Sequence, residues 1–401
     1  MAAVRVALIA LVAAALGAGI ALGIGLVSGL VGGSTTETVV VRASPTPTDT
    51  PAVVRGAAPA VSAGSFSPAR IFAARSPGVV TVFAYFGGQG AQGSGFVISA
   101  DGTILTNAHV ITDAGETMPG AKVAAASSVY AEFSDHDRVP ATIVGWDVFD
   151  DVGVIRVAPS AHALAPLPLG RSATVAVGEP VAAIGSPLGN EDSLAVGVVS
   201  AVGRSIAALT APHFQLIDAI QTDAPIAHGS SGGPLLDAAG RVIGINAQIR
   251  SDAGGLAGIG FAVPIDAARR SLIDLLAGRR VAYAYAGVQT EDLTSSLARH
   301  LGLRVTRGAL VDHVTSGGPA AKAGIRGGSH DAQFQGQTIV TGGDVVLAIN
   351  GRPVRSAGDL VRIVTNRLRP GTTALFTTLR GGRTRSVAVR LATRPADPQF
   401  P

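Results

Sequence analysis

The sequence predicts a mainly β protein with two folded units that follow an apolar N-terminal segment. Glycine supplies 52 of the 401 residues, nearly twice its usual share of about 7%, while aromatic residues make up only 4%. Between residues 79 and 202, short apolar stretches alternate with Gly, Pro and Asp turns, a spacing typical of all-β barrels or sandwiches. With 47% hydrophobic and 14% charged residues, the chain can bury a core, which excludes wholesale disorder.

The composition also excludes several classes of site and partner. Cysteine is absent, so a disulfide framework, a Cys-ligated zinc site and a cysteine nucleophile are excluded. The net charge is +4, but the 31 basic residues are scattered, and we expect no nucleic-acid partner. Residues 134–138 (Ser-Asp-His-Asp-Arg) contain oxygen ligands, yet no second cluster completes a site, so we interpret them as a polar loop. No metal or organic cofactor is expected.

The N-terminal segment is long enough to cross a membrane. Residues 6–33 carry no charge and are mostly small or aliphatic, so we expect one transmembrane helix within residues 1–33, with residues 6–31 in the bilayer. A cleaved signal peptide is the alternative, although its apolar region usually spans only about 7–15 residues. Arg5 precedes the segment and Glu37 follows it, which predicts a cytoplasmic N-terminus and an extracytoplasmic remainder at the cell membrane. Residues 34–68, rich in Ser, Thr, Pro and Ala, are expected to be a flexible linker.

Two folded units are expected after the linker, at residues 69–278 and 281–395. In the first, Asp101-Gly102 predicts a hairpin turn, and a helical pattern over 265–277 closes at Gly278. Strands are expected at residues 79–86, 95–99, 103–106, 141–145, 152–157, 180–185 and 197–202. The second unit has helical spacing at 357–367 and strand-like stretches at 309–314, 374–379 and 386–391.

Three strings in the first unit indicate nucleophilic catalysis. Residues 106–110 read Thr-Asn-Ala-His-Val, 147–154 read Asp-Val-Phe-Asp-Asp-Val-Gly-Val, and 229–233 read Gly-Ser-Ser-Gly-Gly. A serine hydroxyl needs a base within reach, and the base needs a carboxylate that fixes its tautomer. Residues 229–233 also fit the nucleophile elbow of α/β-hydrolases, but a strand-like stretch rather than a helix follows them, which disfavours an esterase.

With residues 93–99 (Gly-Ser-Gly-Phe-Val-Ile-Ser) and 221–235, these strings resemble the HtrA/Deg (high-temperature requirement) serine proteases. The resemblance covers roughly residues 70–395 and implies a trypsin-like double β-barrel followed by a PDZ domain. It implies a catalytic triad of His109, Asp151 and Ser231, with an oxyanion hole formed by the amides of Gly229, Ser230 and Ser231. The family usually has Pro-Gly-Asn-Ser at the nucleophile, whereas this chain has His-Gly-Ser-Ser at 228–231. Ser230 supplies the same backbone N–H, so we expect the oxyanion hole to be retained.

Sequence position also indicates which carboxylate belongs to the triad and which side chains the substrate pocket accepts. Asp147 and Asp150 compete with Asp151 for the carboxylate role, but Asp151 matches the family position, and we interpret the other two as solvated turn residues. Residues 225–228 before the nucleophile hold no acid, and we interpret Asp223 as structural. We therefore expect cleavage after small or medium aliphatic residues, rather than after Arg or Lys.

The C-terminal unit resembles a PDZ domain, a small β sandwich with two helices. Such domains add a peptide C-terminus to a sheet edge and hold its carboxylate in a backbone nest. The matching loop is Tyr285, Ala286, Gly287 and Val288; the alternative is a plain strand edge in a packing domain. Residues 326–341 look like a surface insertion.

Together these expectations describe a membrane-anchored extracytoplasmic serine endopeptidase for protein quality control. By resemblance, its substrates would be unfolded or damaged proteins, peptide C-termini would bind the PDZ domain, and the chain could form a trimer. The alternative is a catalytically weak chaperone or a PDZ peptide-binding scaffold that keeps the protease fold. The intact set of His109, Asp151 and Ser231 favours the enzyme.

Overall fold

The computed structural model describes residues 66–114, 123–185, 193–207, 210, 215–227, 229–247 and 259–395. The expected membrane segment within residues 1–33 and nearly all of the expected linker lie outside these ranges. Within them, no helix is both long and apolar enough to cross a membrane.

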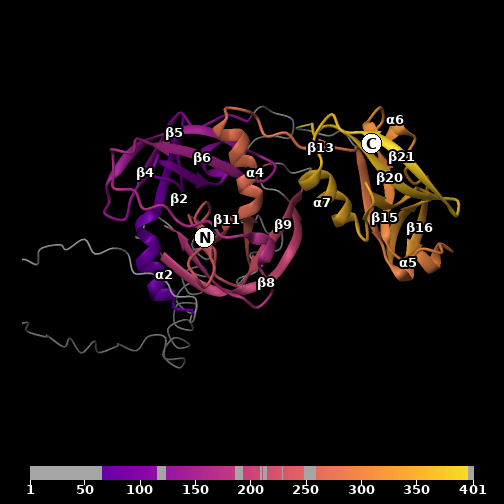
Figure 1. Ribbon diagram of the computed structural model, residues 1–401, viewed down its shortest axis with the longest axis horizontal. Coiled ribbons are helices and arrows are strands. Elements are labelled where there is room, and N and C mark those ends of the chain that lie inside the picture. Colours follow the sequence, from indigo (N-terminus) through magenta and orange to yellow (C-terminus); the bar gives the residue numbers. More distant parts are fainter. Residues whose placement is uncertain are drawn as a thin grey trace, which may run out of the picture. The chain divides into compact units, whose positions relative to one another are not determined.

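Six strands form a first closed barrel in the order β1-β2-β3-β6-β5-β4 (Figure 1). Their bounds are β1 Val79–Phe86, β2 Gln89–Val97, β3 Thr103–Thr106, β4 Ser128–Glu132, β5 Arg138–Asp147 and β6 Val152–Val157. The barrel closes because β1 pairs with both β2 and β4. Fully buried β-branched side chains such as Val80, Val82, Ile104 and Ile155 fill its interior.

A second closed barrel follows in the order β10-β11-β12-β9-β8-β7. Its strands are β7 Pro180–Gly185, β8 Ser193–Ala207, β9 Gln215–Thr222, β10 Pro234–Leu236, β11 Val242–Ala247 and β12 Gly260–Pro264. The expectation of a double β-barrel is therefore confirmed.

Short helices border the barrels. They are α2 Pro68–Arg75, η1 Ser76–Gly78, α3 Ala108–Ile111, η2 Ser172–Thr174 and α4 Ile265–Leu276. Helix α4 follows β12 of the second barrel but also packs on β5 and β6 of the first. It comes close because Gly145 has no side chain: a Cβ added there would lie 3.0 Å from Leu275 Cδ2. Helix α4 therefore joins the two barrels.

The expected hairpin turn at Asp101-Gly102 is confirmed between β2 and β3. Asp101 Oδ1 accepts hydrogen bonds from the Thr103 amide (3.2 Å) and from Thr103 Oγ1 (2.8 Å). Gly102 has a φ of 87°, and a Cβ added there would lie 2.0 Å from the Val157 carbonyl oxygen. The turn thus requires glycine for two separate reasons.

The C-terminal unit has a five-strand path, β14-β15-β18-β20-β21, with β19 paired to β18. Its elements are β13 Ala284–Tyr285, β14 Val288–Leu293, α5 Ser295–His300, β15 Gly308–Val314, α6 Pro319–Ala323, β16 His330–Phe334, β17 Gln337–Thr341, β18 Val345–Ile349, β19 Arg352–Pro353, α7 Ala357–Arg367, β20 Thr373–Arg380, β21 Arg383–Arg390 and β22 Ala392–Thr393. Leu360 and Val364 of α7 pack with Phe376 and Val346 of the sheet in one core.

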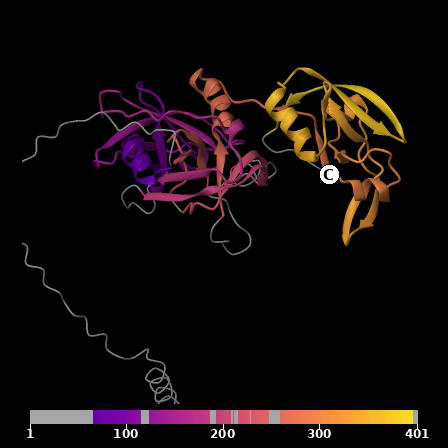
Figure 2. The same cartoon turned by 60° about the horizontal axis from the view of Figure 1, so that its bottom comes forward.

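The expected insertion at 326–341 is a β-hairpin. Strands β16 and β17 pair in antiparallel register and form an orange arm that extends from the C-terminal unit in Figure 2. The expected helix at 357–367 is confirmed, whereas the expected strand at 141–145 is too short, because β5 begins at Arg138 and ends at Asp147. The apolar run that marks a strand in the sequence is interrupted by Arg138 and Pro140 at one end of β5 and by Asp147 at the other.

Candidate active site

The three candidate catalytic residues lie on three different connections of the two barrels. His109 is on α3 directly after β3, and Asp151 occupies the turn between β5 and β6. Ser231 belongs to the connection between β9 and β10 in the second barrel.

His109 and Asp151 are joined by two hydrogen bonds. His109 Nδ1 lies 2.8 Å from Asp151 Oδ2, and the His109 amide donates to Asp151 Oδ1 at 3.0 Å. Burial lowers the pKa of His109, but the negative charge and hydrogen bond of Asp151 raise it by more. The pKa of His109 therefore lies above its ordinary value, and the Asp151 contact at Nδ1 fixes the orientation of the ring.

The backbone of Asp151 adopts a conformation that is unusual for a residue with a side chain. Its φ is 52°, in the left-handed region, which costs a non-glycine residue about 1–3 kcal/mol. Asn107, fully buried beside it, donates from Nδ2 to the Asp151 carbonyl oxygen at 2.9 Å. The His109 and Asn107 contacts hold both the side chain and the backbone of Asp151.

Residues 229–233, which include Ser231, form a turn that we call the nucleophile turn. Ser94 of β2, which is fully buried, binds this turn to the first barrel. Its amide donates to the Ser231 carbonyl oxygen (2.7 Å), and its hydroxyl donates to the Gly229 carbonyl oxygen (2.6 Å). Its own carbonyl oxygen accepts from Thr106 Oγ1 at 2.6 Å. Gly232 has a φ of 89°, and a Cβ there would lie 2.0 Å from the Ser94 carbonyl oxygen. Sequence reasoning assigned no role to Ser94 or Asn107, although both lie inside the quoted strings.

The amides of the turn are not equivalent. The Ser230 amide, which we expected in the oxyanion hole, donates to the Ala227 carbonyl oxygen at 3.0 Å. The Gly232 amide donates to the Asn246 carbonyl oxygen at 2.9 Å. These two N–H groups are therefore engaged within the protein, while Gly229, with a φ of 90°, shapes the turn ahead of Ser231. His228 lies outside the described residues.

The interpretation of Asp147 and Asp150 as solvated turn residues is wrong. They are only 3% and 4% exposed. Asp147 Oδ2 accepts from Ser271 Oγ on α4 (2.6 Å) and from the Tyr283 hydroxyl, which also bonds Asp150 Oδ2 at 2.8 Å. The sequence could not show this burial, because Ser271 and Tyr283 follow Asp147 by 124 and 136 positions.

The segment before Ser231 carries the apolar side chain of Ile226 and the carboxylate of Asp223, which accepts a backbone hydrogen bond. Asp223 Oδ1 accepts from the Val198 amide at 2.6 Å, which ties β8 to this segment. Ile226 lies against Gly260 of β12, where a Cβ would come within 2.8 Å of Ile226 Cδ1.

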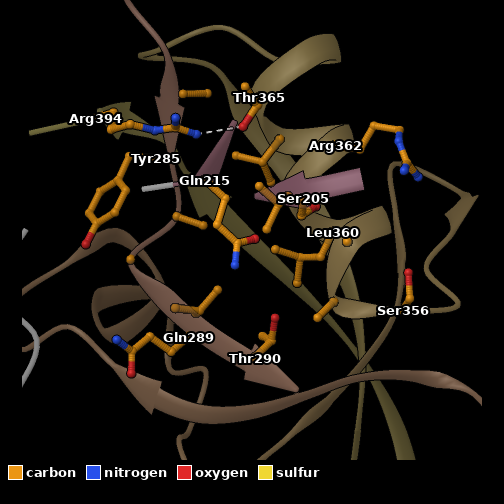
Figure 3. A pocket seen from close by; sticks show the side chains of 18 of the residues that line it. Ser205, Gln215, Tyr285, Gln289, Thr290, Ser356, Leu360, Arg362, Thr365 and Arg394 are labelled. Carbon is orange, nitrogen blue, oxygen red and sulfur yellow. Dashed lines mark hydrogen bonds between the residues drawn. The ribbon is translucent and has the colours of Figure 1, made fainter. Parts of the chain in front are cut away.

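The four candidate peptide-binding residues, Tyr285 to Val288, line a cavity of about 600 Å³ together with α7 (Figure 3). Gly287 has a φ of 74°, and its carbonyl oxygen accepts from the Thr315 amide at 3.0 Å. Leu360 of α7 lines the same cavity, as Figure 3 shows. The loop and helix thus border one cavity, which both apolar side chains such as Leu360 and polar ones such as Gln215 and Thr290 line.

Comparisons with known families agree with this architecture. A trypsin-like peptidase domain family matches residues 93–245, and a PDZ domain family matches residues 284–391. A probable periplasmic serine endoprotease DegP-like of Pseudomonas fulva (strain 12-X) is 38% identical over 317 residues, which cover 78% of this chain and 59% of that protein. The corresponding protein of Hahella chejuensis (strain KCTC 2396) is 37% identical over 313 residues, with the same two shares. The chain thus spans less than two thirds of the length of these relatives.

Solved structures extend the comparison to three dimensions. The HtrA-type protease AlgW with tripeptide has a TM-score of 0.67 and 32% identity, covering 82% of this chain and 98% of that one. The serine endoprotease from Yersinia pestis has a TM-score of 0.59 and 28% identity, with the same coverage. Since nearly the whole AlgW chain is matched and both domain families are present, this chain belongs to the HtrA/Deg family of trypsin-like serine proteases with a C-terminal PDZ domain.

Proposed function

We propose that the chain is a serine endopeptidase that cleaves unfolded or damaged proteins through His109, Asp151 and Ser231. The observation that carries the proposal is the His109–Asp151 pair in the first barrel, beside a nucleophile turn that Ser94 fastens to the same barrel. A trypsin-like site requires this combination of an oriented base and a fixed serine turn from two barrels.

In this proposal, Ser231 Oγ attacks the carbonyl carbon of the scissile peptide bond while His109 Nε2 accepts its proton. Asp151 accepts from Nδ1–H and stabilises the imidazolium that forms. His109 then returns the proton to the leaving amine, which leaves an acyl-enzyme on Ser231. Water, deprotonated by His109, hydrolyses this ester and restores the serine.

The oxyanion hole in this mechanism uses two amides rather than the three we expected. The Ser230 amide donates to Ala227, so we assign the hole to the amides of Gly229 and Ser231. The Ser94 hydroxyl supports this assignment because it fixes the Gly229 carbonyl oxygen, and with it the peptide plane between the two donors.

We also propose that the substrate pocket accepts small or medium aliphatic side chains. Asp223 is held by the Val198 amide, and Ile226 offers an apolar wall beside Gly260. An apolar pocket separates aliphatic side chains by only about 1–3 kcal/mol per methylene, so we expect a broad preference. Mapping cleavage sites on an unfolded protein tests this, and a preference for Arg or Lys would contradict it.

The cellular setting is part of the same proposal. The DegP-like relatives are described as periplasmic, which supports an extracytoplasmic catalytic unit. The apolar stretch at 6–33 supports a single-pass anchor with a cytoplasmic N-terminus. The cavity beside residues 285–288 would take a peptide C-terminus, and we propose assembly as a trimer by resemblance to the family.

The decisive test is casein cleavage by the full chain and by Ser231→Ala, with Ser386→Ala, an exposed serine on β21, as the matched control. We expect Ser231→Ala to abolish both cleavage and covalent labelling by a fluorophosphonate, while Ser386→Ala keeps both. Cleavage that survives Ser231→Ala, or that EDTA removes, would overturn the serine mechanism. A correctly folded chain that binds unfolded casein but never cuts it would instead indicate a chaperone or scaffold.

A further inference from the structure

A tyrosine that precedes the PDZ domain is buried beside the loop that carries Asp151. Tyr283 is 5% exposed, and its ring packs edge-to-face on Phe149, with ring centroids 5.4 Å apart. Its hydroxyl donates a hydrogen bond toward Asp147 and lies 2.8 Å from Asp150 Oδ2. One phenol from outside the barrels thus reaches both carboxylates that precede Asp151.

The two carboxylates are held from several sides. Asp147 Oδ1 accepts from the Phe149 amide at 3.0 Å, and Asp147 Oδ2 accepts from Ser271 Oγ at 2.6 Å. The charged groups that face the pair are Arg270 on α4, 3.5 Å from Asp150, and Arg394, whose guanidinium lies 5.1 Å from the centre of the Tyr283 ring. The Thr210 hydroxyl also donates to the Val148 carbonyl oxygen. The loop from 147 to 150 is therefore fixed by polar contacts from α4, from Tyr283 and from Thr210.

Asp151 depends on this loop for its orientation. Its left-handed φ of 52° is a conformation that persists only where the surrounding structure holds it. Asn107 and His109 hold Asp151 from the α3 side, as described above. Asp150 is bonded directly to Asp151 through the chain, so the Tyr283 hydroxyl restrains the opposite end of the same strained turn.

We infer that Tyr283 is a positioning residue for catalysis: its hydroxyl holds residues 147–150 so that Asp151 meets His109. The inference rests on the proposed role of Asp151 in the triad. Without the hydroxyl, both carboxylates lose a hydrogen bond to Tyr283. Asp147 keeps the Ser271 and Phe149 contacts, and Asp150 keeps the Arg270 ion pair. Asp151 then spends less time in the orientation that supports the imidazolium, and the chemical step slows.

The test compares Tyr283→Phe with Tyr130→Phe in the full chain. Both variants remove one phenolic oxygen, and Tyr130 lies on β4, where its ring packs edge-to-face on Tyr85. With a fluorogenic peptide substrate, we expect kcat of Tyr283→Phe to fall about tenfold, equivalent to about 1.4 kcal/mol, with KM unchanged within twofold. Tyr130→Phe should keep both constants.

The pH profile separates positioning from a purely structural role. Asp151 raises the pKa of His109, so a loosened Asp151 moves the acidic limb of kcat/KM to lower pH. We expect this shift in Tyr283→Phe and not in Tyr130→Phe. An unchanged kcat and acidic limb, even with a lower melting temperature, would overturn the inference.

Two further variants keep the outcome interpretable. If Tyr283→Phe does not fold, Ser271→Ala is used instead, because it removes the other hydroxyl that bonds Asp147 Oδ2. Ser271→Ala should shift the acidic limb of kcat/KM in the same direction. An unshifted limb overturns the inference. Asp151→Asn tests the proposed function separately. If Asp151→Asn retains full activity, the proposed triad is wrong, whereas inactivity of Asp151→Asn together with normal Tyr283→Phe kinetics overturns only the inference.

Discussion

Ser94 shows at the scale of one residue how the first barrel binds the turn that carries Ser231. It is fully buried, and its amide and hydroxyl donate to two carbonyl oxygens of the nucleophile turn. Removing the hydroxyl would leave the Gly229 carbonyl oxygen, at a part-buried position, without that donor. The peptide plane ahead of Ser231 would then be less firmly fixed.

We therefore expect Ser94→Ala to lower kcat about tenfold on a peptide substrate, with little change in KM. Ser127→Ala is the matched control, because the Ser127 hydroxyl donates to the Tyr85 carbonyl oxygen (2.8 Å) at an exposed site in the same barrel. Equal kcat values for the two variants would show that the Ser94 hydroxyl has no part in shaping the turn.

Asp150 provides a pH-dependent prediction. Burial, and then the negative charge of Asp147, raise the pKa of Asp150 to about 6 from an ordinary value near 3.8, although Arg270 opposes the shift. The folded state therefore holds the proton more tightly than the unfolded state does. The resulting stabilisation is fully present below about pH 4 and is lost as the pH rises through about 6.

Asp150→Asn replaces the carboxyl with a neutral group of the same shape, whose amide oxygen can still accept from the Tyr283 hydroxyl. We expect its melting temperature, relative to the parent chain, to be higher at pH 8 than at pH 5. Thermal unfolding at the two pH values measures this difference. A relative melting temperature that is the same at both would mean that Asp150 does not titrate in this range.

At the scale of elements, two turns separate two costs of replacing glycine: Gly88 lies between β1 and β2, and Gly102 lies between β2 and β3. Gly102 (φ 87°) and Gly88 (φ 105°) both have positive φ, but only Gly102 faces a neighbour, the Val157 carbonyl oxygen. Gly88→Ala should cost about 1–2 kcal/mol of unfolding free energy from backbone strain alone. Gly102→Ala should cost more, because β6 must move to admit the methyl group.

Urea denaturation of both variants measures the difference, and the m-value reports whether unfolding remains two-state. Equal losses would show that β6 yields freely at Val157, in conflict with a tightly closed first barrel.

The elements also show what could and could not be predicted from the sequence. Strands such as Val79–Phe86 and Val152–Val157 were predicted at their observed bounds, since β-branched runs ending at turn residues mark buried strands. His109, Asp151 and Ser231 could be proposed as a triad from the sequence because each lies in a local string. Tyr283 and Ser271 were not, because their roles arise from contacts across more than 120 positions. Asp147 was misjudged for the same reason: a carboxylate in a turn looks solvated until its partners are known.

At the scale of the whole molecule, Tyr283 lies where the protease unit gives way to the PDZ unit. Two residues after it begins the loop 285–288, which borders the cavity of about 600 Å³. On the other side, the Arg394 amide, which follows β22, donates to the Tyr283 carbonyl oxygen at 2.8 Å. Both ends of the C-terminal unit therefore adjoin the residue that restrains the Asp151 loop.

This arrangement predicts that removing the PDZ domain lowers basal activity more when the truncation also removes Tyr283 than when it keeps Tyr283. A chain ending at Ala282 lacks Tyr283, whereas a chain ending at Ala286 retains it but loses Arg394. We expect the shorter chain to show the kcat loss of Tyr283→Phe or a larger one, and the longer chain to lie between it and the full protein. Steady-state kinetics on a short peptide, which needs no PDZ contact, measures this. Identical kcat values for the two truncated chains would show that the Tyr283 hydroxyl acts only when the C-terminal unit is present, because the Arg394 contact would then be needed to hold the ring against Phe149.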